Sequence, residues 1–284
     1  MMDGKGLIIP AGVIISDSAN ATQIGGGIDP ALIRNWVMFW DVFICPDNNF
    51  ISTGLPPDLE YLQQQDLLTR NRVPFSGGVS SGDFGKLFLA AQEITYIQKN
   101  AENPGKWSMA QSEGIIKGQS NASGTEACLV FELINSIQLP DRLVPINEIL
   151  EFKEKRRDEL AAFHTYLEEI YLRISASKDI PRSKTHELQK LESAIFEYNR
   201  TVQEKFQNRL LSSLRVILDR SLISSVGMAM GAASLAPSIG LPALGAGVMV
   251  GSASFAIQSI LTERTPNTGI HPLTYVTKIE NELF

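Results

Sequence analysis

Residues 29–46, DPALIRNWVMFWDVFICP, decide the fold class of the first half of the chain. Asp29 is a suitable N-cap and Pro30 suits the first helical position, where its missing N–H costs no hydrogen bond, so a helix is predicted through residue 39. The run DVFICP then predicts a buried strand that stops at Pro46. A helix followed directly by a buried strand is typical of a mixed α/β domain.

The residues on the amino-terminal side predict a further strand. GLIIPAGVIIS, residues 6–16, is rich in Ile and is bounded by Gly and Ser, which is typical of a short strand. Pro10 donates no hydrogen bond, so we expect it to split this strand or to place it at a sheet edge. The mixed α/β domain predicted from these elements covers residues 1–139.

Two helices and a loop are predicted after Pro46. PDLEYLQQQDLLTRN, residues 57–71, predicts a short helix with Asp58 as its N-cap. DFGKLFLAAQEITYIQKN, residues 83–100, predicts a second helix because its apolar residues recur at helical spacing. Residues 104–124 are polar and rich in glycine, and we expect a loop there.

Residues 140–284 predict a helical domain. Apolar residues recur at helical spacing from about 145 to 174 and again from about 188 to 217, which predicts a long antiparallel helical hairpin over residues 145–220. Ser183 is the candidate N-cap of the second helix, and the tail of residues 263–284 predicts a short strand or helix. The expected fold class is an α+β or α/β part followed by a mainly α-helical part.

Residues 221–262 contain no charged side chain, and their length exceeds the roughly 20 residues that a membrane-spanning helix needs. However, 22 of these 42 residues are Gly, Ala or Ser and only 16 are Leu, Ile, Val, Met or Phe, so insertion into lipid is weakly driven. Small residues four apart let helix backbones approach closely; they are Gly227 with Gly231 and Gly247 with Gly251.

Two hypotheses follow for this apolar segment. A close-packed hairpin that stays buried is the favoured interpretation, because folded domains also contain elements that are apolar on all sides. The alternative is a membrane-active protein that inserts residues 222–261. Membrane association therefore stays open but disfavoured.

The overall composition narrows the partners and the compartment. A net charge of −6 disfavours nucleic acid, whose binding requires clustered Lys and Arg, and no nucleic-acid partner is predicted. Cys45 and Cys128 lie far apart in apolar settings, which predicts buried free thiols and a reducing cytoplasm. The first residues, MMDGKGLIIPAG, do not fit a signal peptide.

No complete catalytic motif occurs in the sequence. SGGVSSGDFGKL, residues 76–87, comes nearest to a phosphate-binding loop, but Ser80 replaces the first glycine of that motif and Leu87 replaces its final Ser or Thr. The three histidines show no metal-ligand spacing, so neither a metal nor another cofactor is predicted.

An enzyme is nevertheless a hypothesis for the N-terminal half. Asp17 and Asp41 lie near the ends of strand-like segments, where α/β proteins often hold catalytic carboxylates. Lys86 belongs to the glycine-rich loop described above. We take these three residues as weak catalytic candidates, since Asp serves more often in caps and turns.

The densest charge cluster is EFKEKRRDEL, residues 151–160. Its ordinary interpretation is a solvated helix face. The functional alternative is that Lys153, Arg156 and Arg157 recognise a carboxylate or phosphate of a partner, which their donor groups suit.

Two segments resemble a family of uncharacterised bacterial proteins of similar length. The first has an FWD-type segment, matched by Phe39, Trp40 and Asp41. The second is a helix with an FK-x-K-R-x-x-E-L-type pattern, and its matching residues are Phe152, Lys153, Lys155, Arg156, Glu159, Leu160 and Phe163. The resemblance implies no activity, and it implies a possible setting in bacterial defence.

Three classes of function are therefore expected. The first is a non-enzymatic interaction or assembly protein in a bacterial defence or stress system, which binds a protein partner or self-associates. The second is a membrane-active effector, and the third is an enzyme with a site in the N-terminal half.

Overall fold

The computed structural model describes residues 4–11, 13–18, 21–25, 28–78, 84–110, 130, 133–134, 137, 143–202 and 269–283. These residues divide into two compact units. The α/β unit holds the described residues of Met1–Ile33 and Trp40–Cys128. The helical unit holds Arg34–Phe39 and the described residues of Leu129–Ile223 and Arg264–Phe284. A mixed α/β part and a helical part are thus both present, while the predicted boundary after residue 139 lies outside the described residues.

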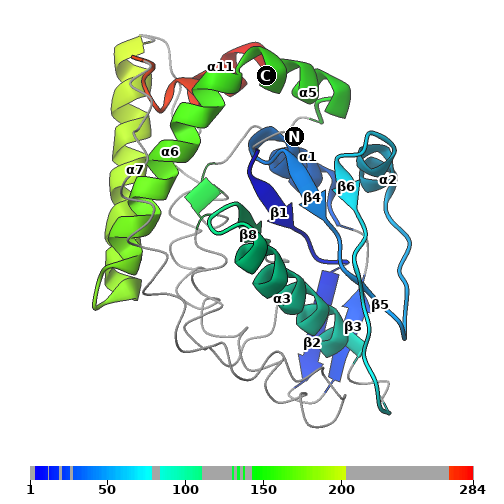
Figure 1. The fold of residues 1–284 in the computed structure, drawn as a ribbon. Helices are drawn as coiled ribbons and strands as arrows, with labels where there is room; N and C mark the ends of the chain where they lie inside the picture. The colour runs from blue at the N-terminus through cyan, green and yellow to red at the C-terminus, as the bar shows by residue number, and fades with distance from the viewer. Residues whose placement is uncertain are drawn as a thin grey trace. The chain divides into compact units, whose positions relative to one another are not determined.

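The α/β unit contains a four-stranded parallel sheet in the order β6-β4-β1-β8 (Figure 1). The strands are β1 (Gly6–Ile8), β4 (Val42–Ile44), β6 (Leu68–Thr69) and β8 (Trp107–Met109). The predicted strand DVFICP is confirmed as β4. β1 is paired on both sides, so Pro10 splits the strand predicted for residues 6–16 and does not place its first part at an edge.

The loop predicted for residues 104–124 is wrong at Trp107–Met109, because these residues form β8. They pair in parallel with Gly6–Ile8. A Cβ atom on Gly6 would lie 2.4 Å from the ring of Trp107, so glycine is needed where the indole covers β1. A three-residue strand that pairs with a distant segment leaves no periodicity to detect.

Two further strand pairs complete the unit. β5 (Asp47–Asn48) and β7 (Arg72–Val73) continue the ladder of β4 and β6 beyond Pro46. Phe43 lies opposite Leu68 and Asp47 lies opposite Arg72, so the register is kept through the interruption. β2 (Val13–Ser18) and β3 (Ala21–Gly25) form an antiparallel hairpin.

The predicted first helix is confirmed as α1 (Pro30–Phe39). Asp29 Oδ1 accepts the N–H of Ala31 at 2.9 Å, which satisfies one of the free donors of the first turn. Pro30 occupies the first helical position, as its fixed φ favours.

The helix predicted for residues 57–71 is shorter than expected. α2 (Pro57–Gln64) begins at Pro57, so Asp58 lies in its first turn and is not the N-cap. Asp66 has φ 57°, a left-handed conformation that an Asp tolerates, and Leu67 N–H donates to Leu62 C=O at 2.9 Å. This arrangement ends the helix and turns the chain into β6.

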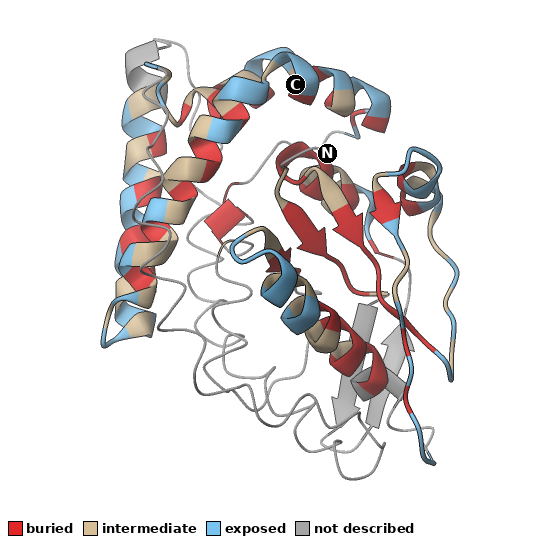
Figure 2. Cartoon of the chain, viewed as in Figure 1, coloured by how far each residue is buried: buried red, intermediate tan, exposed pale blue. Residues whose placement is uncertain are grey.

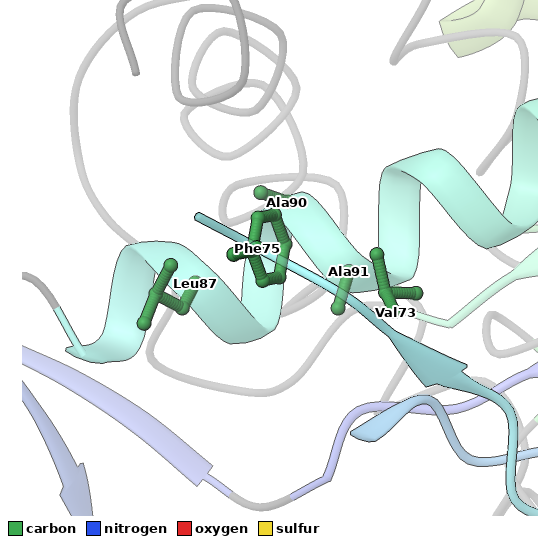
Figure 3. Close-up of a cluster of buried hydrophobic side chains, with 5 residues drawn as sticks. All are labelled: Val73, Phe75, Leu87, Ala90 and Ala91. Atoms are coloured by element: carbon green, nitrogen blue, oxygen red, sulfur yellow. The ribbon is translucent and has the colours of Figure 1, made fainter. Parts of the chain in front are cut away.

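α3 (Phe84–Glu102) confirms the predicted second helix, and it contacts β1, β5, β7 and β8. Figure 3 shows the core formed at its first turns, where five buried side chains meet: Val73, Phe75, Leu87, Ala90 and Ala91. Figure 2 shows that β1 is buried throughout. Because α3 packs on Val73, it covers the sheet face to which Val73 belongs.

The helical unit contains α5 (Ile146–Lys155), α6 (Arg157–Ser175), α7 (Ile180–Val202) and α11 (Thr274–Leu283). The single helix predicted for residues 145–174 is broken at Arg156, whose φ of −115° and ψ of 29° are not helical. Asp179, and not Ser183, caps α7, because its Oδ1 accepts the N–H of Arg182 at 3.1 Å. α6 and α7 lie side by side (Figure 1), and the predicted extension of the second helix to residue 220 lies outside the described residues.

An aromatic core holds the helical unit together. The ring of Phe39 lies 5.8 Å from that of Phe163 and 6.0 Å from that of Tyr275, centroid to centroid. Tyr275 Oη donates to the carbonyl of Met38 at 2.6 Å, and His164 Nε2 lies 2.8 Å from the carbonyl of Phe39. The last carbonyl groups of a helix have no N–H donors within the helix. These two contacts therefore satisfy carbonyls at the end of α1. Both segments of the sequence resemblance contribute to this core.

Candidate functional site

Polar side chains interact where the parallel strands β4 and β6 end. In open parallel sheets, ligands bind outside the carboxyl ends of the strands. β4 is followed by Cys45 and Pro46, and β6 is followed by Arg70. We call residues Asp47–Thr53, which begin with the two residues of β5, the polar loop, and this loop with Arg70 is the candidate site.

Asp47 is the centre of the polar loop. Its Oδ2 accepts a hydrogen bond from Ser52 Oγ at 2.7 Å and lies 3.2 Å from Arg70 Nη2. Its Oδ1 accepts the N–H of Asn48 at 2.9 Å. The carboxylate therefore contacts a hydroxyl, an amide and a guanidinium group.

The two asparagines of the polar loop fix its backbone. Asn48 Oδ1 accepts the N–H groups of Phe50 and Ile51 at 2.9 and 2.8 Å. Asn49 Nδ2 donates to the carbonyl of Phe75 at 2.9 Å, and Asn49 Oδ1 accepts the N–H of Phe75 at 2.7 Å. These bonds give the loop one defined conformation before any ligand arrives.

Arg70 ties the polar loop to the sheet. Its Nη1 donates to the carbonyl of Thr53 at 2.7 Å, and Thr53 Oγ1 donates to the carbonyl of Ala11, beyond β1, at 3.1 Å. Nη2 forms the ion pair with Asp47 but no aligned hydrogen bond, and Nε meets no acceptor among the residues that the structure describes. The Arg70 side chain is 21% exposed, although Nε and Nη2 themselves are covered.

Strand alternation separates two faces at this site. Asn48 lies opposite Val73 and therefore belongs to the face that α3 covers. Cys45, Asp47 and Arg70 share the other face, because the ladder places Cys45 opposite Arg70. Burial raises the pKa of the Cys45 thiol to about 11, while Arg70 lowers it and Asp47 raises it further. The prediction of a buried free thiol is confirmed for Cys45, whereas Cys128 lies outside the described residues.

The strand order has a topological switch point between β1 and β8. The chain adds β4 and β6 on one side of β1, and then places β8 on the other side. Such a switch point is where doubly wound proteins usually open a crevice for a ligand. Gln92 of α3 fills this point, since its Nε2 donates to the carbonyls of Ile8 and Ala110 at 3.1 and 2.8 Å. The side chain is buried and joins the carboxyl ends of both strands. The candidate site therefore lies at the neighbouring strand pair, β4 and β6.

The structure places the predicted catalytic candidates apart from the polar loop. Asp41 precedes β4 and lies at its amino end, where its Oδ2 accepts the N–H of Lys5 at 3.1 Å. Asp17 belongs to β2 and Lys86 to the first turn of α3, and the positions of these two side chains lie outside the described residues. Catalytic roles for the three residues stay predictions.

The three basic residues predicted to bind a partner have different surroundings. Lys153 is buried on α5. Arg156 pairs with Glu282 of α11, and the hydrogen bond to Glu282 raises the pKa of the guanidinium above its ordinary value. Arg157 is exposed and lies 3.0 Å from Glu154, which is exposed as well. A role in partner recognition stays a prediction, and only Arg157 of the three is open to solvent over most of its side chain.

The apolar segment 222–261, with Gly227, Gly231, Gly247 and Gly251, lies outside the described residues. Within the ranges that are described, no helix combines the length and the apolar character needed to cross a membrane. The same ranges hold no group of three or more His, Cys, Asp or Glu side chains placed to bind a metal ion.

The sequence interpretation missed the polar loop. Asp47 and Asn48 follow a predicted strand directly, so the motif CPDN after a buried run was an available signal. Arg70 offered no signal, because the prediction placed it in a helix and the structure places it after β6. Its partners Ser52 and Thr53 are common surface residues whose side chains gain meaning only through these contacts.

Comparison with known proteins gives a family without an assigned activity. The model of the Family of unknown function (DUF6236) matches residues 18–284, which includes the helical unit and the α/β unit from residue 18 onward. No curated protein and no solved structure matches the chain. The match covers most of the sequence, and the chain therefore belongs to the family of unknown function DUF6236.

Proposed function

We propose that the α/β unit binds a small polar ligand at the carboxyl ends of β4 and β6, through Arg70 and the polar loop. One observation carries the proposal: Nε and Nη2 of Arg70 are covered by protein, yet they have no aligned acceptor among the described residues. A buried donor without an acceptor costs about 1–3 kcal/mol, and more when it is charged. Such a group in a folded protein calls for an explanation, and a ligand that supplies the acceptor is one.

Two further features support a ligand at this place. The polar loop begins with β5, beyond the carboxyl end of β4, which is the side of a parallel sheet where α/β proteins bind ligands. Its conformation is fixed by side-chain hydrogen bonds to the backbone, so binding requires little ordering of the loop.

Thermal unfolding of three proteins tests the proposal. Wild type, Arg70→Met and the matched control Arg182→Met are heated with inorganic phosphate, acetate, ribose or myo-inositol. Arg182 is exposed on α7 of the helical unit, so its replacement removes the same charge outside the site. We expect at least one probe to raise the Tm of wild type and Arg182→Met but not that of Arg70→Met. An equal rise in Arg70→Met, or no rise with any probe, contradicts the proposal.

We propose a second role in assembly, contact with a protein partner or a second copy, in a bacterial defence or stress setting. The supporting observation is the exposure of two basic side chains beside the α5–α6 break: Lys155 is 67% exposed and Arg157 is 60% exposed. Analytical ultracentrifugation of wild type, Arg157→Glu and the exposed control Arg182→Glu checks this role. We expect weaker self-association in Arg157→Glu alone; a monomer at every concentration argues against self-association.

A further inference from the structure

We infer that the ligand at Arg70 is neutral and presents two adjacent hydroxyl oxygens, as a sugar or a polyol does. This inference rests on the proposed function, because it specifies the ligand of the same site.

The shape of the guanidinium group sets the first requirement. Nε and Nη2 lie along one edge of the planar group, and their N–H bonds are spaced for two oxygens side by side. The remaining nitrogen, Nη1, donates to the carbonyl of Thr53 at 2.7 Å, which fixes the plane. The edge is thus held in place while it has no aligned acceptor within the described ranges. Both an oxyanion and a pair of neighbouring hydroxyl groups have suitable spacing.

The charge of Asp47 distinguishes these two ligands. Its Oδ2 lies 3.2 Å from Arg70 Nη2 and already balances the guanidinium charge. An oxyanion on the same edge would lie close to this carboxylate, and repulsion between like charges is strong where water is partly excluded. A hydroxyl group avoids that repulsion. A neutral ligand is therefore favoured.

Asp47 also has capacity for a hydroxyl donor. A carboxylate offers about four lone-pair positions. The protein uses one hydrogen bond to each oxygen, from Ser52 Oγ to Oδ2 and from the N–H of Asn48 to Oδ1. A ligand hydroxyl can therefore accept from Arg70 and donate to Asp47, whereas acetate has no O–H group to donate.

Phe50 adds an apolar surface to the polar loop. The residue is 38% exposed, although large hydrophobic side chains are usually buried. Its N–H is held by Asn48 Oδ1, so the residue has a fixed backbone position. Sugars and cyclic polyols have an apolar ring face that packs on aromatic side chains, whereas small anions have none.

Nuclear magnetic resonance of the 15N-labelled full chain tests the inference at the atom concerned. The Nε–H signal of Arg70 is identified by its loss in Arg70→Lys, or by through-bond assignment of wild type if that variant does not fold. We expect ribose or myo-inositol to shift this signal in a saturable manner, and phosphate and acetate to leave it unchanged.

Calorimetry then compares the affinities of the variants for the same polyol. Arg70→Lys keeps the positive charge but loses the paired Nε and Nη2 donors, so we expect about tenfold weaker binding. Arg182→Lys, on the exposed surface of α7, is the control and should bind as wild type does.

The outcomes separate this inference from the proposed function. A shift of the Arg70 signal with phosphate or acetate, and none with the polyols, overturns the neutral ligand and supports the site. A signal that no probe moves overturns both the neutral ligand and the proposed site. Binding of a polyol that Arg70→Lys leaves unchanged contradicts the assigned contact.

Discussion

The two ends of strand β4 carry acidic residues that differ in what surrounds them. Asp41 precedes the strand, and its carboxylate accepts the N–H of Lys5 while its own N–H donates to the carbonyl of Lys5 at 2.9 Å. Asp47 follows the strand and pairs with Arg70, whose Nε–Nη2 edge has no aligned acceptor among the described residues. At the amino end of β4, the carboxylate and the N–H of Asp41 are both hydrogen-bonded. At the carboxyl end, two N–H donors of Arg70 have no aligned acceptor among the described residues.

This difference shows why position along a strand is not enough to assign a catalytic carboxylate. Asp41 joins the start of β1 to the start of β4, and a Cβ atom on Gly4 would lie 2.5 Å from its Oδ2. Such close packing on both sides is typical of a structural contact. At the carboxyl end, buried donors of two side chains have no aligned acceptor among the described residues, Nδ2 of Asn48 and the Nε–Nη2 edge of Arg70, which is typical of a binding site.

The largest expected effect concerns the centre of the sheet. Gly6→Ala places a methyl group 2.4 Å from the Trp107 ring, so the indole, or β8 with it, must move away from β1, and we expect a loss of about 3 kcal/mol in the free energy of unfolding. Gly54→Ala is the control, because nothing lies within 4 Å of its added Cβ. Urea unfolding measures both variants. Equal stabilities would contradict the pairing of β1 with β8.

The next effect tests the closed amino end. Asp41→Ala removes the acceptor of the Lys5 N–H, and we expect the free energy of unfolding to fall by about 2 kcal/mol. Ligand affinity should stay unchanged, since the site lies at the opposite end of β4. A variant as stable as wild type would show that this contact contributes little.

A smaller effect concerns α3, which covers the sheet between its two ends. Burial raises the pKa of Glu93 from 4.5 to about 7. The unfolded chain therefore releases this proton at a lower pH than the folded chain, and stability present below pH 4.5 is lost as the pH rises through 7. The glutamine side chain in the variant Glu93→Gln does not ionise, so the variant keeps this stability. At pH 8 we expect Glu93→Gln to be more stable than wild type by on the order of 1–2 kcal/mol.

Urea unfolding of wild type and Glu93→Gln at pH 4, 6 and 8 measures this dependence. The two proteins should have similar stabilities at pH 4 and should diverge as the pH rises. Parallel curves would mean that Glu93 is solvated in the folded chain.

The smallest effect on stability is expected at the carboxyl end. Arg70→Met removes an ion pair and the bond to the Thr53 carbonyl, but it also removes two donors that lack aligned acceptors. The gains and losses nearly offset each other, and we expect a loss below about 1 kcal/mol. Urea unfolding beside Asp41→Ala gives the comparison directly. A larger loss in Arg70→Met than in Asp41→Ala would reverse the assignment of the two ends.

Local patterns in the sequence predicted several elements correctly. The cap at Asp29, the strand before Pro46 and the helix over residues 83–100 were predictable, because each depends on neighbouring residues alone. The mixed α/β character of the first half followed from these elements. Their order in the sheet did not follow, since it depends on pairing between distant segments.

The errors have identifiable physical causes. The helix predicted for residues 57–71 included Leu68 and Thr69, but the chain turns at Asp66, which has a left-handed conformation, and these two residues form β6. β8 is too short to show a period. Arg156 is a good helix former in isolation, and its non-helical backbone is found where its side chain pairs with Glu282 from the other end of the chain. The candidate site depended on β6, so it was hidden by the same error.

The affinity of ribose for three proteins, measured by calorimetry, tests the central claim most directly. The proteins are wild type, Asp41→Asn and Arg70→Lys, which keep the size or the charge of the side chains at the two ends of β4. We expect Asp41→Asn to bind as wild type does and Arg70→Lys to bind about tenfold more weakly. Equal affinities in all three proteins, or a loss in Asp41→Asn alone, would contradict the assignment of the carboxyl end as the binding site.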